Sequence, residues 1–239
     1  MVVQEKKQKG EIRIFVDLWK LNDACVHDPF PMLFIDKVLD NVSGQEAYSF
    51  TDGFSKYHQI KITQVDRSKM TFPTEWGCFH YIMMSFGLKN VPAIFSHVVI
   101  AAFKEFIHKF LEVYFDYWTV FELVKHHVAS LRLMLDMCHK YQIALNLKKC
   151  IFCVPFGILL GHVLCKQGLM VEPAKIAMIV NLEAPRNVKK LCATLGHTGY
   201  YKKFIKEYAQ ITVPMEKLLK KDATFCWDEE FQCRLDVLK

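Results

Sequence analysis

The sequence has little of what marks a membrane-spanning or disordered chain. It contains only 10 Gly in 239 residues, shows no low-complexity segment, and is 52% hydrophobic, which is typical of a globular protein. The longest apolar stretch, residues 150–161, is interrupted by Pro155 and Gly157 and falls short of the ~20 residues that span a bilayer. No signal peptide is recognisable. We therefore expect a globular protein with no membrane partner.

A disulfide framework is also missing. The nine cysteines are odd in number and scattered along the chain without a regular spacing, which favours reduced thiols in an intracellular protein, in the cytoplasm or the nucleus. Only Cys150 and Cys153 are close in sequence. They have no second pair at zinc spacing, so a metal role for them is disfavoured.

The net charge excludes few classes of function. Lys and Arg number 31 against 25 Asp and Glu, a net charge of +6. This mild excess suits an anionic partner but does not require one, because many enzymes with neutral substrates are equally basic. The length allows one large domain or two smaller ones.

Hydrophobic periodicity predicts strands mixed with helices, followed by a helical segment beyond Gly168, which indicates the α+β class. The strand-like segments are residues 13–17, 47–52, 57–62, 70–72, 79–83, 114–121, 143–147, 151–154 and 158–163. The helical segments are residues 33–44, 92–107, 124–141, 173–182, 188–208 and 211–219.

Two carboxylates stand out against apolar surroundings. Asp116 lies within the aromatic and β-branched run of residues 114–121, and Asp52 ends the apolar strand 47–52. A buried Asp is unfavourable unless it is paired or binds a cation. A simpler interpretation of Asp116 is a turn residue between two short strands, and both interpretations stay open at this point.

If the two carboxylates meet on one sheet, they repel unless a divalent cation bridges them. Mg²⁺ favours such oxygen ligands together with substrate phosphates. Two metals about 3.5–4 Å apart activate an attacking hydroxyl and stabilise a leaving group. The pattern therefore points to nucleotidyl transfer. Lysines and tyrosines mixed within residues 189–208 suit a nucleic-acid backbone, with an ordinary solvated helix face as the alternative.

Short motifs in a fixed order extend this hypothesis. They are Arg13-x-x-x-Asp17-x-x-Lys20-Leu21-Asn22, Phe50-Thr51-Asp52, Tyr57-His58-Gln59-Ile60, Phe86-Gly87-Leu88-x-Asn90-x-Pro92-Ala93-x-Phe95, Tyr114-Phe115-Asp116, Leu145-Asn146-x-x-Lys149-Cys150, Leu160-Gly161-His162 and Leu195-Gly196-x-x-x-Tyr200-Tyr201-x-x-Phe204-Ile205. In these motifs the chain resembles the reverse transcriptase of Ty3/Gypsy-type long-terminal-repeat retrotransposons over nearly its whole length.

The resemblance implies an α+β polymerase right-hand fold. Fingers and palm, with an antiparallel sheet and packed helices, would occupy residues 1–165. A small helical thumb and the start of a connection would occupy residues 166–239. The chain would be cut from a polyprotein, beginning inside the fingers and stopping where a tether leads into RNase H, whose acidic catalytic residues are absent.

The resemblance also implies roles for matching residues. Asp52 and Asp116 would bind Mg²⁺, with Mn²⁺ as an alternative. Lys149 would be the general acid for the leaving pyrophosphate, or else a surface lysine. Residues that would bind the incoming dNTP are Lys6, Lys7, Arg13, Tyr57, Phe86 and Gly87. The primer grip would be Leu160, Gly161 and His162. The partner would be an RNA or DNA template–primer, and the oligomeric state stays open.

The main departure from the family pattern is Tyr117, which stands where the second of two adjacent Asp is expected. A Tyr is an uncharged phenol at neutral pH, so one negative charge is missing. Glu112 lies more than about 10 Å away along the strand and is a poor substitute. Further departures are Trp19, Lys56, Ser85 and Ser96.

These departures predict a polymerase fold with weak or absent polymerase activity. One alternative is a non-catalytic nucleic-acid binder, and another is a fragment without a cellular role. A diguanylate-cyclase-like palm would also hold two carboxylates, but it would lack the motifs above.

Overall fold

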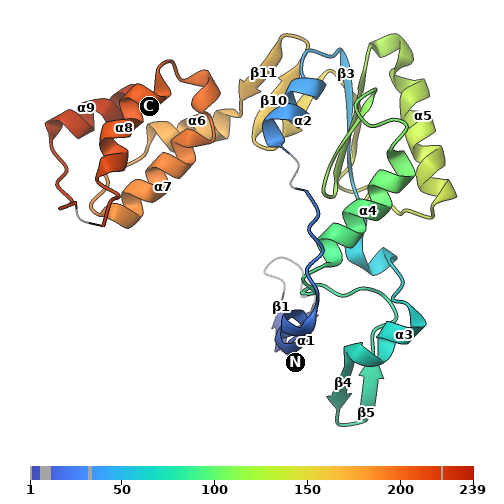
Figure 1. Ribbon diagram of the computed structural model, residues 1–239. Coiled ribbons are helices and arrows are strands. Elements are labelled where there is room, and N and C mark those ends of the chain that lie inside the picture. Colours follow the sequence, from blue (N-terminus) through green and yellow to red (C-terminus); the bar gives the residue numbers. More distant parts are fainter. Residues whose placement is uncertain (1, 6–11, 32–33, 222) are drawn as a thin grey trace. The chain divides into compact units, whose positions relative to one another are not determined.

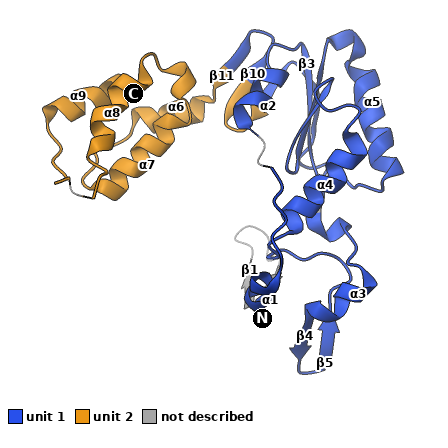
Figure 2. Ribbon diagram, viewed as in Figure 1, with its two compact units in different colours: residues 1–157, 164–169 blue, residues 158–163, 170–239 orange. Residues whose placement is uncertain are grey.

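A computed structural model describes residues 2–5, 12–31, 34–221 and 223–239, so the predicted ligands Lys6 and Lys7 lie outside the described residues (Figure 1). The chain divides into two compact units (Figure 2). Unit 1 comprises residues 1–157 and 164–169, and unit 2 comprises residues 158–163 and 170–239. No helix among the described residues is both long and apolar enough to cross a membrane.

A four-stranded antiparallel sheet forms the centre of unit 1. Its strands, in spatial order, are β6 (Leu111–Tyr114), β7 (Tyr117–Glu122), β3 (Ala47–Asp52) and β8 (Ile151–Val154). The strands are rich in β-branched and aromatic residues, which fit a pleated, buried surface. The register pairs the last residue of β3, Asp52, with the first residue of β7, Tyr117.

Two long helices pack against this sheet (Figure 1). They are α4 (Val91–Phe103), which carries Pro92 in its first turn where a missing N–H is harmless, and α5 (Val124–Lys140). The helix α2 (Ile35–Val42) packs against β6. The buried core that joins α4, α5 and the sheet consists of Phe95, Val99, Ala102, Phe103, Leu111, Val113, Trp118, Val120, Leu131, Met134 and Cys138.

Smaller elements complete unit 1. Two antiparallel pairs are β1 (Val2–Glu5) with β2 (Ile12–Phe15) and β4 (Thr71–Thr74) with β5 (Gly77–His80). Short helices are α1 (Trp19–Ala24), η1 (Lys56–Gln59), α3 (Gln64–Arg67) and η2 (Ser68–Met70). The strands β9 (Phe156–Leu159), β10 (His162–Cys165) and β11 (Gly168–Val171) form a separate three-stranded sheet whose residues are divided between the two units.

Unit 2 is otherwise helical. Its helices are α6 (Pro173–Val180), α7 (Val188–Gly199), η3 (Lys202–Phe204), α8 (Tyr208–Lys217) and α9 (Glu229–Leu238). Asn187 and Asp228 cap α7 and α9, because their side chains accept hydrogen bonds from free main-chain amides of the first turn. The buried centre is Leu191, Met215 and Leu238, with a ring of partly buried apolar residues around it.

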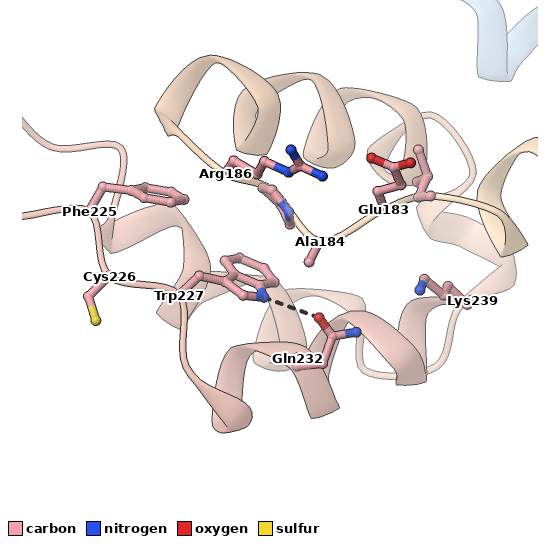
Figure 3. A pocket seen from close by; sticks show the side chains of 10 residues that line it. Glu183, Ala184, Arg186, Phe225, Cys226, Trp227, Gln232 and Lys239 are labelled. Carbon is pink, nitrogen blue, oxygen red and sulfur yellow. Dashed lines mark hydrogen bonds between the residues drawn. The ribbon is translucent and has the colours of Figure 1, made fainter.

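An open pocket of about 720 Å³ lies in unit 2, between the segment 182–186 and the segment 225–227 (Figure 3). Trp227 stands in this pocket and donates a hydrogen bond from its ring nitrogen to Gln232 Oε1 at 3.2 Å. Its ring also packs on Phe225 and Phe231. The pocket contains none of the predicted site residues.

Several predicted elements are wrong in type or extent. The strand-like residues 57–62 begin as the 3-10 helix η1, because Ser55 takes a left-handed conformation (φ 49°) that turns the chain out of β3. Residues 143–147 form only an isolated bridge, Gly53 to Leu145, and no full strand.

Turns divide two further predicted elements. The predicted strand 158–163 is split into β9 and β10 by a reverse turn with positive φ at Leu160 (49°) and Gly161 (72°). The predicted helix 188–208 stops at Gly199, and α8 starts only after Glu207 with φ 56°. The helix α9 has no counterpart among the predicted elements.

Candidate active site

A tight turn between β6 and β7 holds Asp116. Phe115 in this turn is left-handed (φ 52°), a strained state for a non-glycine residue, and such strain tends to occur at functional sites. The buried indole of Trp118 donates a hydrogen bond to Phe115 O at 3.2 Å and fixes the turn. Asp116 is only 7% exposed. Asp116 is therefore a turn residue that is also buried, and its role as a metal ligand stays a prediction.

The second carboxylate lies on the neighbouring strand end. Asp52 is 3% exposed and pairs in register with Tyr117, next to Asp116. The amide of Gly53 donates to Asp116 O at 3.2 Å, which ties the end of β3 to the turn. The structure thus brings Asp52 and Asp116 together at one end of the sheet.

Tyr117 completes this end of the sheet with a phenol. Its side chain is 47% exposed, and its strand position faces Asp52. Glu112 is buried elsewhere and accepts hydrogen bonds from Asn41 Nδ2 at 2.9 Å and His108 Nδ1 at 2.6 Å. Within the described residues no group of three or more His, Cys, Asp or Glu could hold a metal. The carboxylates at this end of the sheet are those of Asp52 and Asp116.

Lys149 reaches this carboxylate pair from a separate segment. Its Nζ donates to Asp52 Oδ2 at 2.8 Å, and this hydrogen bond raises the pKa of Lys149 above its ordinary value. Main-chain hydrogen bonds hold Lys149 near Asp52. Asn146 N donates to Asp52 O at 2.8 Å, and Lys149 N donates to Asn146 O at 2.8 Å. The structure therefore places Lys149 at the carboxylate pair, with a side chain that is largely exposed, and its role as a general acid stays a prediction.

Gln59 is a positioning residue that the sequence did not reveal. Its side chain donates to Ala144 O at 3.1 Å and accepts from Ala144 N at 2.7 Å, and it also bonds Phe54 O. Phe54 N donates to the same Ala144 O at 2.9 Å. The side-chain amide of Gln59 therefore clamps the segment that leads to Lys149 onto the end of β3. The only available signal was its place in the Tyr57–Ile60 motif.

Two of the predicted nucleotide-binding residues are in contact. The rings of Tyr57 and Phe86 lie 5.2 Å apart edge to face, and Tyr57 also meets the core residue Phe95 at 5.8 Å. Phe86 is about half exposed, and Gly87 next to it adopts φ 98°, a conformation that favours glycine. Arg13 lies in β2, where its main chain pairs with Gln4.

Two asparagines hold the loop that carries Phe86 and Gly87. Asn22 donates to Gly87 O at 2.7 Å and accepts from Lys89 N at 2.8 Å. Asn90 donates to Val26 O at 2.6 Å and accepts from Asp28 N at 3.2 Å. Both belong to the quoted motifs, but their positioning roles become evident only in the fold.

The predicted primer grip is a reverse turn within unit 2. The hydroxyl of Tyr200 donates to Leu160 O at 2.9 Å, and that of Tyr201 donates to Gly161 O at 3.2 Å. His162 is buried and packs against both tyrosine rings. A side chain at Gly161 would meet the Tyr201 hydroxyl at 2.7 Å, so the turn requires glycine. His162 therefore braces the turn from inside.

The oxygen donors at the end of the sheet fit a hard dication. Asp52 and Asp116 are buried, adjoining carboxylates, the ligand type that Mg²⁺ prefers. One dication would meet two carboxylates here, whereas the phenol of Tyr117 adds no negative charge for a second. The donor set is thus adequate for one ion and poor for two.

A family model described as "Reverse transcriptase (RNA-dependent DNA polymerase)" matches residues 4–198. Similar proteins include the Retrovirus-related Pol polyprotein from transposon 297 of Drosophila melanogaster, 32% identical over 89% of this chain and 20% of the relative. The polyprotein from transposon gypsy of the same organism is 30% identical over 87% of this chain and 20% of the relative. The transposon Tf2-3 polyprotein of Schizosaccharomyces pombe is 27% identical over 92% of this chain and 17% of the relative. The chain spans about a fifth of the length of these curated relatives.

Solved structures show the same fold. A foamy viral protease-reverse transcriptase in complex with double-stranded DNA matches with a TM-score of 0.85 at 21% identity, over 98% of this chain and 41% of the other. A foamy viral protease-reverse transcriptase in complex with an RNA/DNA hybrid matches with a TM-score of 0.78 at 20% identity, over 97% of this chain and 32% of the other. The α+β polymerase fold is therefore confirmed. The chain belongs to the reverse transcriptase (RNA-dependent DNA polymerase) family, in the Ty3/Gypsy-type group of retrotransposon polyproteins.

Proposed function

We propose that this chain binds an RNA or DNA template–primer as a reverse transcriptase domain whose nucleotidyl transfer is weakened. The observation that carries the proposal is the end of the central sheet. Asp52 and Asp116 are buried side by side there, and Tyr117 occupies the position opposite Asp52. Two carboxylates retain the ligand type of a polymerase site, while the phenol removes one charge.

Asp52 and Asp116 are the residues that would hold Mg²⁺, with Mn²⁺ as an alternative. When bound, the ion supplies activation of the attacking primer hydroxyl and charge stabilisation of the leaving pyrophosphate. The ammonium group of Lys149, already at Asp52, is suited to give a proton to that leaving group.

The incoming dNTP is assigned to the aromatic pair and the basic residues. Tyr57 and Phe86 form an aromatic surface, next to the glycine turn at Gly87, against which a nucleotide sugar and base can pack. Arg13, together with Lys6 and Lys7, would hold the triphosphate through charge-assisted hydrogen bonds. Each of these basic residues is assigned by resemblance alone.

The template–primer is assigned to the positively charged chain as a whole and to the turn in unit 2. The net charge of +6 favours a polyanion, and the structural neighbours were solved with double-stranded DNA and with an RNA/DNA hybrid. The primer grip of Leu160, Gly161 and His162 would contact the primer strand through the main chain of its turn, with the buried His162 supporting that turn from inside. We assign residues 1–165 to fingers and palm and residues 166–239 to the thumb.

All nine cysteines are free, which supports action in the reducing cytoplasm or nucleus.

A second candidate function is nucleic-acid binding without chemistry. It is favoured by the ion pair of Lys149 with Asp52 and by the missing carboxylate at Tyr117. The fold would then retain the template–primer surface while the carboxylate pair does no catalysis.

Fluorescence anisotropy with a labelled primer–template hybrid tests the shared part of both functions. We expect binding whose affinity falls linearly with salt on a logarithmic scale, as counterion release demands. Failure to bind any hybrid at low salt would contradict both. A primer-extension assay in Mg²⁺ on the same sample then separates them, since only the first function gives detectable extension.

A further inference from the structure

The carboxylate pair already carries a cation that belongs to the protein. Lys149 Nζ lies 2.8 Å from Asp52 Oδ2, a length typical of a charge-assisted hydrogen bond. Asp52 is almost fully buried, whereas the side chain of Lys149 is 61% exposed. The lysine therefore reaches from the surface to an oxygen atom that a metal ion would also need.

The position of the lysine is built into the fold. Asn146 is bonded to the main chain of Asp52, and Lys149 is bonded to Asn146. Gln59 clamps Ala144, earlier in the same segment, onto the end of β3. These contacts hold the main chain of Lys149 close to Asp52. The ion pair is therefore fixed by the backbone as well as by the flexible side chain.

The formal charges decide how a metal would compete. Asp52 and Asp116 contribute two negative charges and Lys149 one positive charge, which leaves a net charge of −1. A carboxylate in place of Tyr117 would make this −2 and would favour a dication over the lysine. The phenol therefore shifts the balance toward the internal cation.

We propose that Lys149 is the resident counter-cation of Asp52, and that a divalent ion binds this site only by displacing its ammonium group. This inference rests on the proposed function in taking Asp52 and Asp116 as metal ligands. It adds that the lysine and the metal exclude one another at Asp52. Lys149 thus controls metal occupancy at Asp52.

A Mn²⁺ titration of the purified chain without nucleic acid tests the proposal, with free Mn²⁺ followed by electron paramagnetic resonance. Lys149→Met keeps the length of the side chain and removes its charge. We expect it to bind Mn²⁺ about ten-fold more tightly than the original chain, because a hydrogen bond to a charged group no longer has to be broken. Lys149→Arg retains the charge and is expected to bind as weakly as the original chain.

Lys148→Met is the matched control, since Lys148 is the exposed neighbouring lysine. It should leave Mn²⁺ affinity unchanged. Asp52→Asn in the Lys149→Met background should abolish the gain, which places the ion at Asp52. Equal Mn²⁺ affinity in the original chain and Lys149→Met would overturn the proposal, as would an equal gain in Lys148→Met or Lys149→Arg.

Lys149→Met can be less stable than the original chain. The melting temperature, measured with and without Mn²⁺, tests the proposal in that case as well. Removal of the lysine leaves a buried carboxylate unpaired, so the melting temperature without metal should fall, and Mn²⁺ should raise it more than in the original chain. A smaller rise than in the original chain would contradict the proposal. Hybrid binding by anisotropy is measured without divalent ions, so failure of the proposed function would be recognised separately.

Discussion

Amide side chains position much of what surrounds the two carboxylates. Asn22, Gln59 and Asn90 each donate and accept hydrogen bonds with main-chain groups of a distant segment. The sequence placed all three in motifs, but it could not assign these roles. Their partners lie far away along the chain, and only the folded backbone brings donor and acceptor into register.

Ser85 carries a stability cost that a single substitution removes. Its hydroxyl is buried, and it finds no hydrogen-bond partner among the described residues. Ser85→Ala should raise the free energy of unfolding by about 1 kcal/mol, because an unsatisfied buried hydroxyl is lost. Urea denaturation measures this. Ser96 donates to Pro92 O at 2.9 Å, so Ser96→Ala should give no gain. A loss of stability in Ser85→Ala would show that its hydroxyl is satisfied.

His127 links stability to pH. It is a buried residue of α5, and its Nε2 shares a hydrogen bond of 2.8 Å with Ser49 Oγ, while its Nδ1 has no hydrogen-bond partner in the described part of the chain. Burial lowers the pKa of His127, with partial opposition from Glu122. The unfolded chain therefore binds a proton more readily, and stability is complete above the unfolded pKa near 6.5 and is lost as the pH falls below it.

The corresponding measurement is the free energy of unfolding at several pH values between about 7.5 and 5. His127→Gln keeps a polar partner for Ser49 and cannot be protonated in this range, so its stability should fall less on acidification. His126, the preceding residue of α5, is exposed, and His126→Gln should retain the original pH dependence. Identical pH profiles for His127→Gln and the original chain would exclude His127 as the source.

At the scale of elements, the long helices were predictable and the short irregular segments were not. The helices predicted at residues 92–107 and 124–141 correspond to α4 and α5, whose apolar positions repeat with a helical period over several turns. Residues 57–62 alternate like a strand, yet they begin within η1, because the left-handed Ser55 and the hydrogen bonds of Gln59 determine their path. Tertiary contacts override local pattern in such short pieces.

The Gln59 clamp gives a test at the same scale. Ala144 N donates to Gln59 Oε1 at 2.7 Å, so Gln59→Ala should accelerate hydrogen exchange of the Ala144 amide. His58→Ala is the control, since His58 is exposed and its neighbouring position leaves the clamp intact. Equal protection of Ala144 in Gln59→Ala and the original chain would mean that other contacts hold the segment. Primer extension, where detectable, should fall with the loss of protection.

At the scale of the molecule, the resemblance predicted the family and the polymerase fold, and the structure brought Asp52, Asp116 and Lys149 to one place. The sequence could not reveal that Lys149 is bonded to Asp52, because their contact depends on the crossing of the segment 143–149 over the end of β3. The roles of Lys6 and Lys7 stay predictions, since both lie outside the described residues.

The most direct measurement compares Mg²⁺-dependent primer extension by the original chain, Tyr117→Asp and Tyr141→Asp. Tyr141 is about as exposed as Tyr117 (46% against 47%) and follows α5, so it controls for the substitution itself. We predict weak extension by the original chain and by Tyr141→Asp. Tyr117→Asp should extend about ten-fold faster or more, equivalent to about 1.4 kcal/mol of transition-state stabilisation. Robust synthesis by the original chain, with no gain in Tyr117→Asp, would contradict the conclusion that Tyr117 weakens this site.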